Sequence, residues 1–365
     1  MNIATIKFDS FERLQSDDCQ DRIIEARKVL GEKIVILGHH YQNETVYRHA
    51  DYAGDSLKLA QYVQQLDAKY IVFLGVHFMA EVSDILSRDD QITVLPDLSA
   101  GCSMADMANL AKVERTYREI SKVLDFDQTI TPITYINSAA DLKAFCGEHN
   151  GIVCTSTNAP KILEWAFKQR QKVLFFPDQN LGRWTGYKMN IPLEDMTVWD
   201  PDLPLGGLTE KQIIDSKILL WKGHCAVHQM FRLEHIERFR ELHPEGFVIS
   251  HPESPFEVCQ NSDFVGSTEF ILKTIQKADK NTKWLVGTEL NLVNRLANEM
   301  KPEGKLVQFM SHVVCECSTM ARIDPQHLAW TLENILKDSP VNIIKVKESE
   351  AKLAKLALDR MLAVT

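Results

Sequence analysis

Apolar runs of strand length alternate with amphipathic helical stretches along most of the chain. Runs rich in apolar and β-branched residues occur at 32–38, 69–75, 133–137, 151–156, 172–177, 247–250, 283–287 and 305–310. Helical patterns lie between them, including 56–66, 159–169, 255–260, 267–278 and 292–300. Strands that are apolar throughout and alternate with helices are typical of parallel sheets covered on both faces. The pattern therefore predicts an α/β fold.

This strand–helix plan repeats three times. In each repeat a strand ends in polar residues, and a small hydroxyl residue then opens an amphipathic helix. The hydroxyl residues are Ser56, Ser156, and Ser267 with Thr268. Each repeat closes with a cysteine segment, at Cys102, Cys225, and Cys315 with Cys317. Because ligands of open α/β sheets bind outside the carboxyl ends of the strands, we expect the hydroxyls and cysteines to converge on one cavity.

The repeats set the expected domain organisation. We predict three similar three-layer αβα domains with short parallel sheets arranged around a pseudo-threefold axis. Their expected boundaries are 20–122, 123–240 and 241–335, followed by a helical tail over 336–365. A length of 365 residues suits two or three domains.

Composition excludes several classes of protein. With 45% hydrophobic and 25% charged residues, wholesale disorder is ruled out. A net charge of −9 argues against nonspecific nucleic-acid binding. No run approaches the roughly 20 apolar residues of a membrane helix, and the N-terminus lacks a signal-peptide pattern. We expect a cytoplasmic protein without a nucleic-acid or membrane partner.

The eight cysteines are not arranged as a zinc ribbon, and most are expected to be small core residues. Cys154 and Cys259 lie inside apolar patterns and are assigned to the core. Cys102, Cys225 and Cys317 lie beside glycine or among small and polar residues. Three converging thiolates suit a soft metal or an iron–sulfur cluster with one open iron, whereas a single cysteine is more simply an inert thiol.

Polar clusters at the strand ends supply groups for proton transfer. His39 and Tyr41 follow the first strand, and His251 and Glu253 follow a later one. Tyr135 and Asn137 follow the strand between them in the chain. An imidazole, a phenol and a carboxylate around one cavity suit carbonyl and imine chemistry, although each could be a scaffold residue. The hydroxyl residues at helix starts could be N-caps, anion-binding groups, or both.

The motifs closely resemble the quinolinate synthase family (iron–sulfur quinolinate synthetase, type A). They run in family order from about residue 34 to 330: GHHYQ, GDSLKLA, VHFMAE, GCSMAD, YINSAADLKA, VCTSTNA, FFPDQNLGR, WKGHCAVH, SHPE, DFVGSTE, VGTE and CSTM. The resemblance implies condensation of iminoaspartate with dihydroxyacetone phosphate to quinolinate, releasing phosphate and water, in NAD biosynthesis. It also implies a [4Fe–4S] cluster held by Cys102, Cys225 and Cys317, with the fourth iron binding substrate.

The resemblance further implies roles for individual residues. Tyr41, Glu253 and His39 would be catalytic, and His228 would lie near the cluster. The residues expected to contact substrate are His39, Ser56, Tyr135, Ile136, Asn137, Ser156, His251, Pro252, Glu253, Ser267 and Thr268. Cys317 is preferred to Cys315 because it stands three residues before Met320; Cys315 could form a redox pair. Ser254 stands where many relatives have cysteine.

Two alternatives stay open at this point. Another [4Fe–4S] hydro-lyase would use the same open iron to dehydrate a hydroxy acid. A noncatalytic iron–sulfur sensor would carry the cluster without turnover and would not need Tyr41 or Glu253. The resemblance also suggests L-aspartate oxidase as a functional partner and a possible homodimer.

Overall fold

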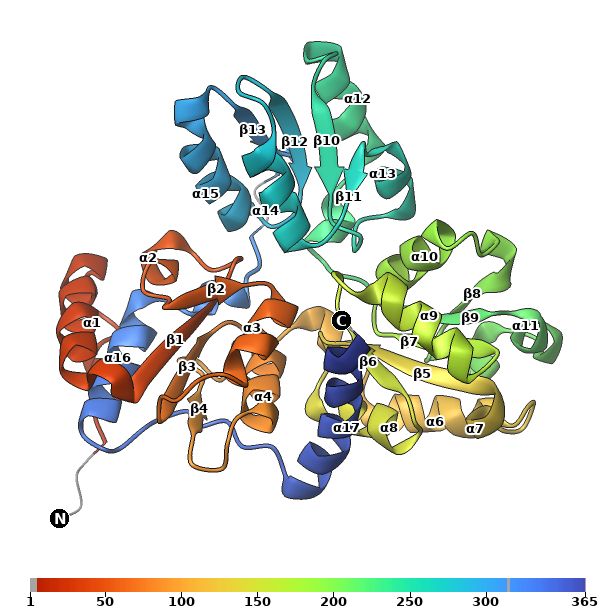
Figure 1. The fold of residues 1–365 in the computed structure, drawn as a ribbon, viewed down its shortest axis with the longest axis horizontal. Coiled ribbons are helices and arrows are strands. Elements are labelled where there is room, and N and C mark those ends of the chain that lie inside the picture. Colours follow the sequence, from red (N-terminus) through yellow and green to blue (C-terminus); the bar gives the residue numbers. More distant parts are fainter. Residues whose placement is uncertain (1–4, 314–315, 365) are drawn as a thin grey trace. The chain divides into compact units, whose positions relative to one another are not determined.

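Among the residues that the structure describes, 5–313 and 316–364, the strands form three parallel sheets. The structure is a computed structural model, drawn in Figure 1. Every pair of neighbouring strands within these sheets is parallel, and helices connect them along the chain. The predicted α/β fold is thereby confirmed.

The three sheets have related strand orders. The first, in order β2-β1-β3-β4, contains Tyr52–Gly54, Ile34–His39, Tyr70–Leu74 and Ile92–Val94. The second, in order β6-β5-β7-β9-β8, contains Ile152–Cys154, Ile130–Tyr135, Lys172–Phe176, Ile218–Trp221 and Met196–Trp199. The third, in order β11-β10-β12-β13, contains Phe264–Val265, Phe247–Ser250, Lys283–Gly287 and Leu306–Phe309. The first and third sheets thus have the same topology, and the second adds one strand.

The chain divides into two compact units. The first comprises Met1–Cys102 with Glu316–Lys347 and holds the first sheet; the second comprises Ser103–Cys315 with Glu348–Thr365 and holds the other two. The boundaries of the three predicted repeats stay a prediction. None of the described helices combines the length and apolar composition that crossing a bilayer requires.

Helices cover both faces of the sheets (Figure 1). Those of the first unit are α1 (Ser16–Leu30), α2 (Glu44–Tyr47), α3 (Ser56–Val63), α4 (His77–Leu86) and α16 (Pro325–Leu336). Around the second sheet lie α5 (Ser103–Asp106), α6 (Leu110–Ile120), α7 (Phe126–Thr129), α8 (Ala140–Glu148), α9 (Ala159–Gln169), α10 (Gln179–Lys188), α11 (Glu210–Asp215) and α17 (Glu348–Val364). Around the third lie α12 (Leu233–Leu242), α13 (Phe256–Asn261), α14 (Thr268–Lys277) and α15 (Leu290–Met300). The last described helix is α17, which packs on α8.

The central strands of the first and third sheets are anchored in the same way. Asp51 Oδ2 accepts a hydrogen bond from the main-chain N–H of Ile36 at 2.8 Å, and Asp263 Oδ2 accepts one from Val248 at 2.7 Å. Each aspartate also pairs with an arginine of the helix before the central strand: Asp51 with Arg27 of α1, and Asp263 with Arg240 of α12. The internal repeat seen in the sequence therefore extends to individual hydrogen bonds.

Candidate active site

Glu253 lies at the centre of a buried polar cluster in the second unit. Its Oε1 accepts a hydrogen bond from Tyr135 Oη at 2.6 Å, and its Oε2 lies 2.9 Å from His228 Nδ1. His251 Nδ1 is 3.9 Å from Oε1. None of these four residues is more than 4% exposed. Strand ends of the second and third sheets are thus brought together within the second unit.

Local hydrogen bonds fix the turn that presents Glu253. His251 follows β10 directly, and its Nδ1 accepts the main-chain N–H of Glu253 at 3.3 Å. The main-chain N–H of Ser254 closes the turn on the carbonyl of His251 at 3.0 Å. His228 sits in a second turn, in which Gln229 N donates to the carbonyl of Cys225 at 2.9 Å. Its other ring nitrogen, Nε2, lies 3.4 Å from Thr288 Oγ1.

The cluster is arranged to hold a buried carboxylate beside imidazoles. Burial alone would raise the pKa of Glu253, but the adjacent His251 and His228, together with hydrogen bonds from His228 and Tyr135, outweigh it and lower that pKa below its usual range. Burial lowers the pKa of His251 to about 3, so this imidazole is neutral at neutral pH. Because its Nδ1 accepts an N–H, the proton of the neutral ring is on Nε2, which makes Nε2 a donor.

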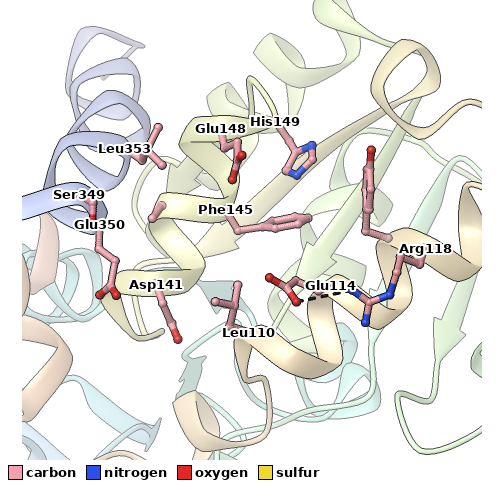
Figure 2. A pocket seen from close by; sticks show the side chains of 12 residues that line it. Leu110, Glu114, Arg118, Asp141, Phe145, Glu148, His149, Ser349, Glu350 and Leu353 are labelled. Atoms are coloured by element: carbon pink, nitrogen blue, oxygen red, sulfur yellow. Dashed lines mark ion pairs between the residues drawn. The ribbon is translucent and has the colours of Figure 1, made fainter. Parts of the chain in front are cut away.

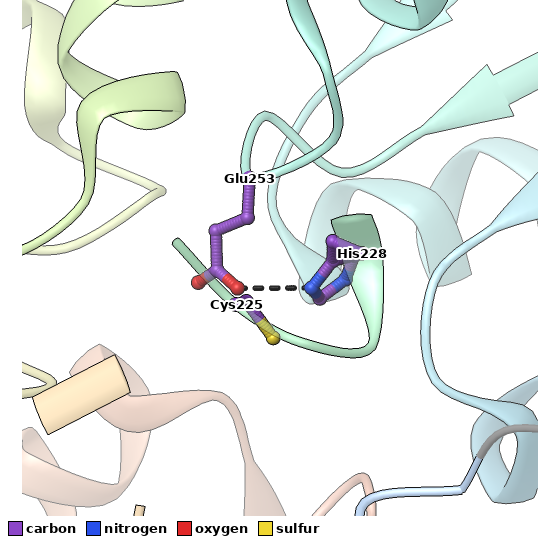
Figure 3. Close-up of side chains that lie close together, drawn as sticks. All are labelled: Cys225, His228 and Glu253. Atoms are coloured by element: carbon purple, nitrogen blue, oxygen red, sulfur yellow. Dashed lines mark ion pairs between the residues drawn. The ribbon is translucent and has the colours of Figure 1, made fainter. Parts of the chain in front are cut away.

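Cys225 adds a thiol to this cluster (Figure 3). Its sulfur, a His228 nitrogen and a Glu253 oxygen all lie within 4.8 Å of one another. A thiol, an imidazole and a carboxylate are all metal-ligating groups. Cys225 is also half-buried rather than enclosed in the core. The donor set here fits the predicted role of Cys225 at a metal centre.

In the first unit, the turn after β1 repeats the geometry of the β10 turn. His39 Nδ1 accepts the main-chain N–H of Tyr41 at 3.2 Å, so its neutral ring also presents Nε2 as a donor. The ring of Tyr41 stands edge-on to that of His39, with centroids 4.7 Å apart. Gln42, next in the turn, donates from Nε2 to Met320 Sδ at 3.3 Å. The turn is therefore joined to the segment that follows Cys317.

An ion pair connects the two cysteine segments of the first unit. Arg322 Nε lies 2.7 Å from Asp97 Oδ2. Asp97 stands five residues before Cys102, and Arg322 stands five residues after Cys317. Within the first unit, the segments of Cys102 and Cys317 are thus tied together. Cys315 lies outside the described residues.

Exposure separates the predicted ligand cysteines from the rest. Cys102, Cys225 and Cys317 are half-buried, whereas the other described cysteines are buried: Cys19, Cys146, Cys154 and Cys259. Burial raises the pKa of Cys154 far above its usual value and that of Cys259 to about 12, which keeps both thiols protonated. The prediction that Cys154 and Cys259 are core residues is confirmed.

The predicted substrate hydroxyls occupy different positions at their helices. Ser56 is the first residue of α3, and Asp55 rather than Ser56 caps that helix. Ser267 caps α14 by accepting from Phe270 N at 3.4 Å, and Thr268 is the first helical residue. The expectation that Ser156 opens its helix is wrong. The chain turns after Thr155, whose main-chain N–H is held by Asn158 Oδ1 at 2.7 Å, so α9 begins three residues after Ser156.

Three further predicted substrate contacts lie beside these groups. Asn137 follows Tyr135 by two residues and is half-buried, and its Oδ1 has no hydrogen-bond partner among the described residues. Ile136 is 1% exposed, and Pro252 is buried in the turn between His251 and Glu253. An enclosed acceptor without a protein partner is what a substrate donor would satisfy.

Sequence reasoning did not find the partners that hold the Glu253 cluster in place. The sequence places His228 three residues after Cys225 but gives no sign that it pairs with Glu253. Thr288 and Asn180 were not singled out at all. The sequence does contain a signal for these two residues. Thr288 in VGTE and Asn180 in FFPDQNLG each lie shortly after an apolar strand, at matching places in their repeats.

A separate cavity of about 530 Å³ lies between α6, α8 and α17 in the second unit (Figure 2). Tyr117, Phe145 and His149 contribute aromatic rings to its lining, and an ion pair between Arg118 and Glu114 lies at its edge. It contains none of the predicted site residues. The cavity is therefore distinct from the polar cluster around Glu253.

Comparison with known proteins identifies the family. A family model described as quinolinate synthetase A protein matches residues 21–363. The chain belongs to the quinolinate synthetase A family. A protein from Rhodopirellula baltica named quinolinate synthase is 52% identical, over 97% of this chain and 93% of that protein. Those named quinolinate synthase from Herpetosiphon aurantiacus and Acidobacterium capsulatum are each 48% identical, over 100% and 98% of this chain and 97% and 95% of their own lengths.

Membership of the quinolinate synthetase A family confirms the resemblance that the motifs predicted, and it makes the chain an enzyme. The family and the half-buried thiols are compatible with an iron–sulfur cluster. The substrates of an enzyme of this family are small molecules. The Glu253 cluster is thus the candidate active site of a quinolinate synthetase A protein.

Proposed function

We propose that the protein condenses iminoaspartate with dihydroxyacetone phosphate to form quinolinate, releasing phosphate and water, in the de novo synthesis of NAD. The observation that carries this proposal is the buried Glu253 carboxylate, held between Tyr135 and His228 beside the thiol of Cys225. A dehydrating cyclisation needs repeated proton transfers at carbon, nitrogen and oxygen. Because its pKa is lowered, Glu253 is ionised at neutral pH, and it is therefore in the form that accepts a proton.

The acid–base roles fall on Glu253, Tyr41 and His39. Glu253 accepts a proton from the substrate on an oxygen that is already oriented by its protein partners. Tyr41 and His39 stand in the matching turn of the first unit, where a phenol O–H and an imidazole Nε2–H can donate. His251 offers a second Nε2–H, which suits a substrate carboxylate or phosphate.

The remaining predicted contacts orient the substrates. Tyr135 and Asn137 follow the central strand of the second sheet, and Ile136 and Pro252 provide apolar walls. The hydroxyl contacts are Ser56, Ser156, Ser267 and Thr268. The helix starts at Ser56 and Thr268 add main-chain N–H groups, which bind anions without an arginine.

We further propose that Cys102, Cys225 and Cys317 hold a [4Fe–4S] cluster. When bound, its fourth iron supplies a Lewis acid that polarises a hydroxyl, carbonyl or carboxylate of the substrate. The half-burial of these three thiols supports the assignment, because the other described cysteines are enclosed. His228 lies close enough to the Cys225 sulfur to modulate it by hydrogen bonding.

The cellular setting follows from the same chemistry. Cysteines that are to bind a cluster must stay reduced, and we propose the cytoplasm as the compartment. Iminoaspartate is a reactive imine that water hydrolyses, so an L-aspartate oxidase is the proposed functional partner that supplies it. A homodimer is the proposed assembly.

The test uses protein purified or reconstituted without oxygen. Iron and sulfide are measured per chain, and quinolinate formation is assayed with dihydroxyacetone phosphate and freshly generated iminoaspartate. We expect about four irons per chain, as a [4Fe–4S] cluster contains. Cys102→Ala, Cys225→Ala and Cys317→Ala should lose both the cluster and turnover. The matched control is Cys19→Ala, which removes a buried thiol of α1 and should retain both.

Each other outcome selects a different function. A cluster without quinolinate formation but with dehydration of a hydroxy acid would indicate a hydro-lyase. A cluster with no turnover of either kind would indicate a sensor. Full iron content in all three cysteine variants would overturn the ligand assignment.

A further inference from the structure

The first turn of α10 touches both loops that build the Glu253 cluster. The main-chain N–H of Gln179 donates to the carbonyl of Gly223 at 3.0 Å, two residues before Cys225. Gly223 approaches so closely that a Cβ at this position would lie 2.2 Å from the carbonyl oxygen of Pro177. The loop carrying Cys225 and His228 is therefore seated on this turn through its backbone.

The side chain of Asn180 reaches the other loop. Its Nδ2 donates to the main-chain carbonyl of Glu253 at 3.1 Å, and the same nitrogen lies 3.4 Å from Gln229 Oε1. Gln229 is the residue after His228. One buried amide, on a residue only 6% exposed, thus contacts Glu253 itself and the residue next to His228.

Asn180 is itself held by the cap of α10. Asp178 Oδ1 accepts the main-chain N–H of Asn180 at 2.6 Å and that of Leu181 at 2.9 Å. Asp178 is 0% exposed, and burial, followed by the charge of Glu253, raises its pKa well above the usual range. A cap enclosed beside the Glu253 carboxylate leaves the start of the helix little freedom to move.

We propose that Asn180 is a positioning residue that keeps the Glu253 carboxylate aligned on His228 and Tyr135. The inference rests on the proposed function for its catalytic consequence. Asn180 does not touch the reacting groups; it fixes the backbone from which Glu253 extends. A carboxylate released from this hold shifts relative to the substrate, and shifts of about 1 Å reduce turnover by up to about 100-fold.

The test compares Asn180→Ala with Gln179→Ala in the cluster-loaded enzyme. Gln179 is the matched control because it lies on the same helical turn. Among the described residues, its side-chain Oε1 accepts a hydrogen bond from Arg183 Nη2, at 3.4 Å. We expect Asn180→Ala to lower kcat about 10- to 100-fold, with KM for dihydroxyacetone phosphate within about twofold of wild type. Gln179→Ala should match wild type in both.

A crystal structure of each variant gives a readout independent of turnover. In Asn180→Ala, the separation of His228 Nδ1 and Glu253 Oε2 should lengthen from 2.9 Å, whereas in Gln179→Ala it should not. Asn180→Asp is nearly isosteric but places an acceptor where Nδ2 donated. It should therefore fold and show the same displacement, which keeps the test decisive if the alanine variant is insoluble.

The outcomes separate the two proposals. Wild-type kcat and an unchanged Glu253 position in Asn180→Ala and Asn180→Asp would overturn the positioning role. Displacement of Glu253 in a protein whose wild type makes no quinolinate would support the positioning role and reject the proposed function.

Discussion

The turns after β1 and β10 share one backbone design but carry different chemistry. In both, a histidine directly after or at the end of the central strand accepts the N–H of the residue two positions later. In both, the residue three positions later closes the turn on the histidine carbonyl, at 3.0 Å each. The residue whose main-chain N–H donates to the imidazole is Tyr41 in one turn and Glu253 in the other.

At this position, one turn presents a phenol and the other an ionised carboxylate. Glu253 is 4% exposed and bonded to side chains from two other segments, whereas Tyr41 is half-buried against His39. A buried carboxylate must be matched by donors on every side, while a phenol needs only one. The comparison teaches that the repeat supplies the scaffold, and that the residue two positions after the histidine decides whether the turn presents a phenol or a carboxylate.

The largest effect is expected from Glu253→Gln. Glutamine keeps the size of the side chain but removes the negative charge that accepts protons and pairs with His228. General acid–base groups contribute about 10²- to 10⁴-fold, and kcat for quinolinate formation should fall by that amount. The measurement is initial rate at saturating substrates, with iron content as the control for an intact cluster.

Tyr41→Phe should have a smaller effect, of about 100-fold, the lower end of the range for acid–base groups, because it removes one donor and leaves the Glu253 carboxylate with its Tyr135 and His228 partners. Steady-state rates of the two variants, measured side by side, give the comparison. A larger loss in Tyr41→Phe than in Glu253→Gln would reverse the assignment of the main base.

Much of this comparison could be predicted from the sequence. The runs at 34–39 and 247–250 are apolar with polar residues directly after them, so strand, turn and histidine were all readable. The strands β2 and β11 have three and two residues. The sequence does not predict them, because a segment this short cannot display a strand periodicity. They form only by pairing with β1 and β10.

The contacts of Glu253 could not be predicted in the same way. Tyr135 is 118 residues from Glu253 in the chain, and His228 comes from a loop with no regular pattern. Such contacts depend on how two sheets pack, which no local sequence signal specifies. Asn180 is a similar case, since nothing in its own segment indicates which carbonyl its amide reaches.

The aspartates that anchor the central strands should be equivalent. Asp51→Ala and Asp263→Ala each remove an acceptor from a strand N–H and a partner from an arginine. A lost charge-assisted bond of this kind costs about 1–3 kcal/mol. Calorimetry should show destabilisation of similar size for both. A difference above about 1 kcal/mol, a typical hydrogen-bond contribution, would mean that the repeat is not energetically symmetric.

A third pair of matching positions, His49 and Asn261, differs in whether the side chain can bind a proton. The carbonyls of His49 and Asn261 both accept from the anchoring arginine, but only His49 can ionise. Burial, then the charges of Arg27 and Arg48, lower the pKa of His49 to about 4, against about 6.5 when unfolded. Between these values only the unfolded chain binds the proton, so stability falls as pH drops from about 6.5 toward 4. His49→Asn, which copies the third repeat, should flatten the dependence of Tm on pH across this range; an unchanged slope would contradict the buried neutral imidazole.

The smallest expected effect lies at the residue that closes each turn. Ser254 is 0% exposed, and its hydroxyl has no hydrogen-bond partner among the described residues. The matching Ser138 of the second sheet is also 0% exposed, but its hydroxyl donates to the carbonyl of Tyr135 and accepts from Thr134 Oγ1, both at 2.8 Å.

Removing the two hydroxyls should therefore have opposite effects. Ser254→Ala deletes a buried polar atom that gains nothing from the fold, and it should leave stability unchanged or raise it by up to about 1 kcal/mol. Ser138→Ala removes both 2.8 Å bonds and leaves Thr134 Oγ1 with its longer bond to the Tyr135 carbonyl, at 3.2 Å, so it should cost about 1–3 kcal/mol. Thermal unfolding of both variants in one buffer decides the matter. Equal destabilisation would mean that Ser254 has a partner in solution, and that the turn after β10 is held as firmly as the one after β5.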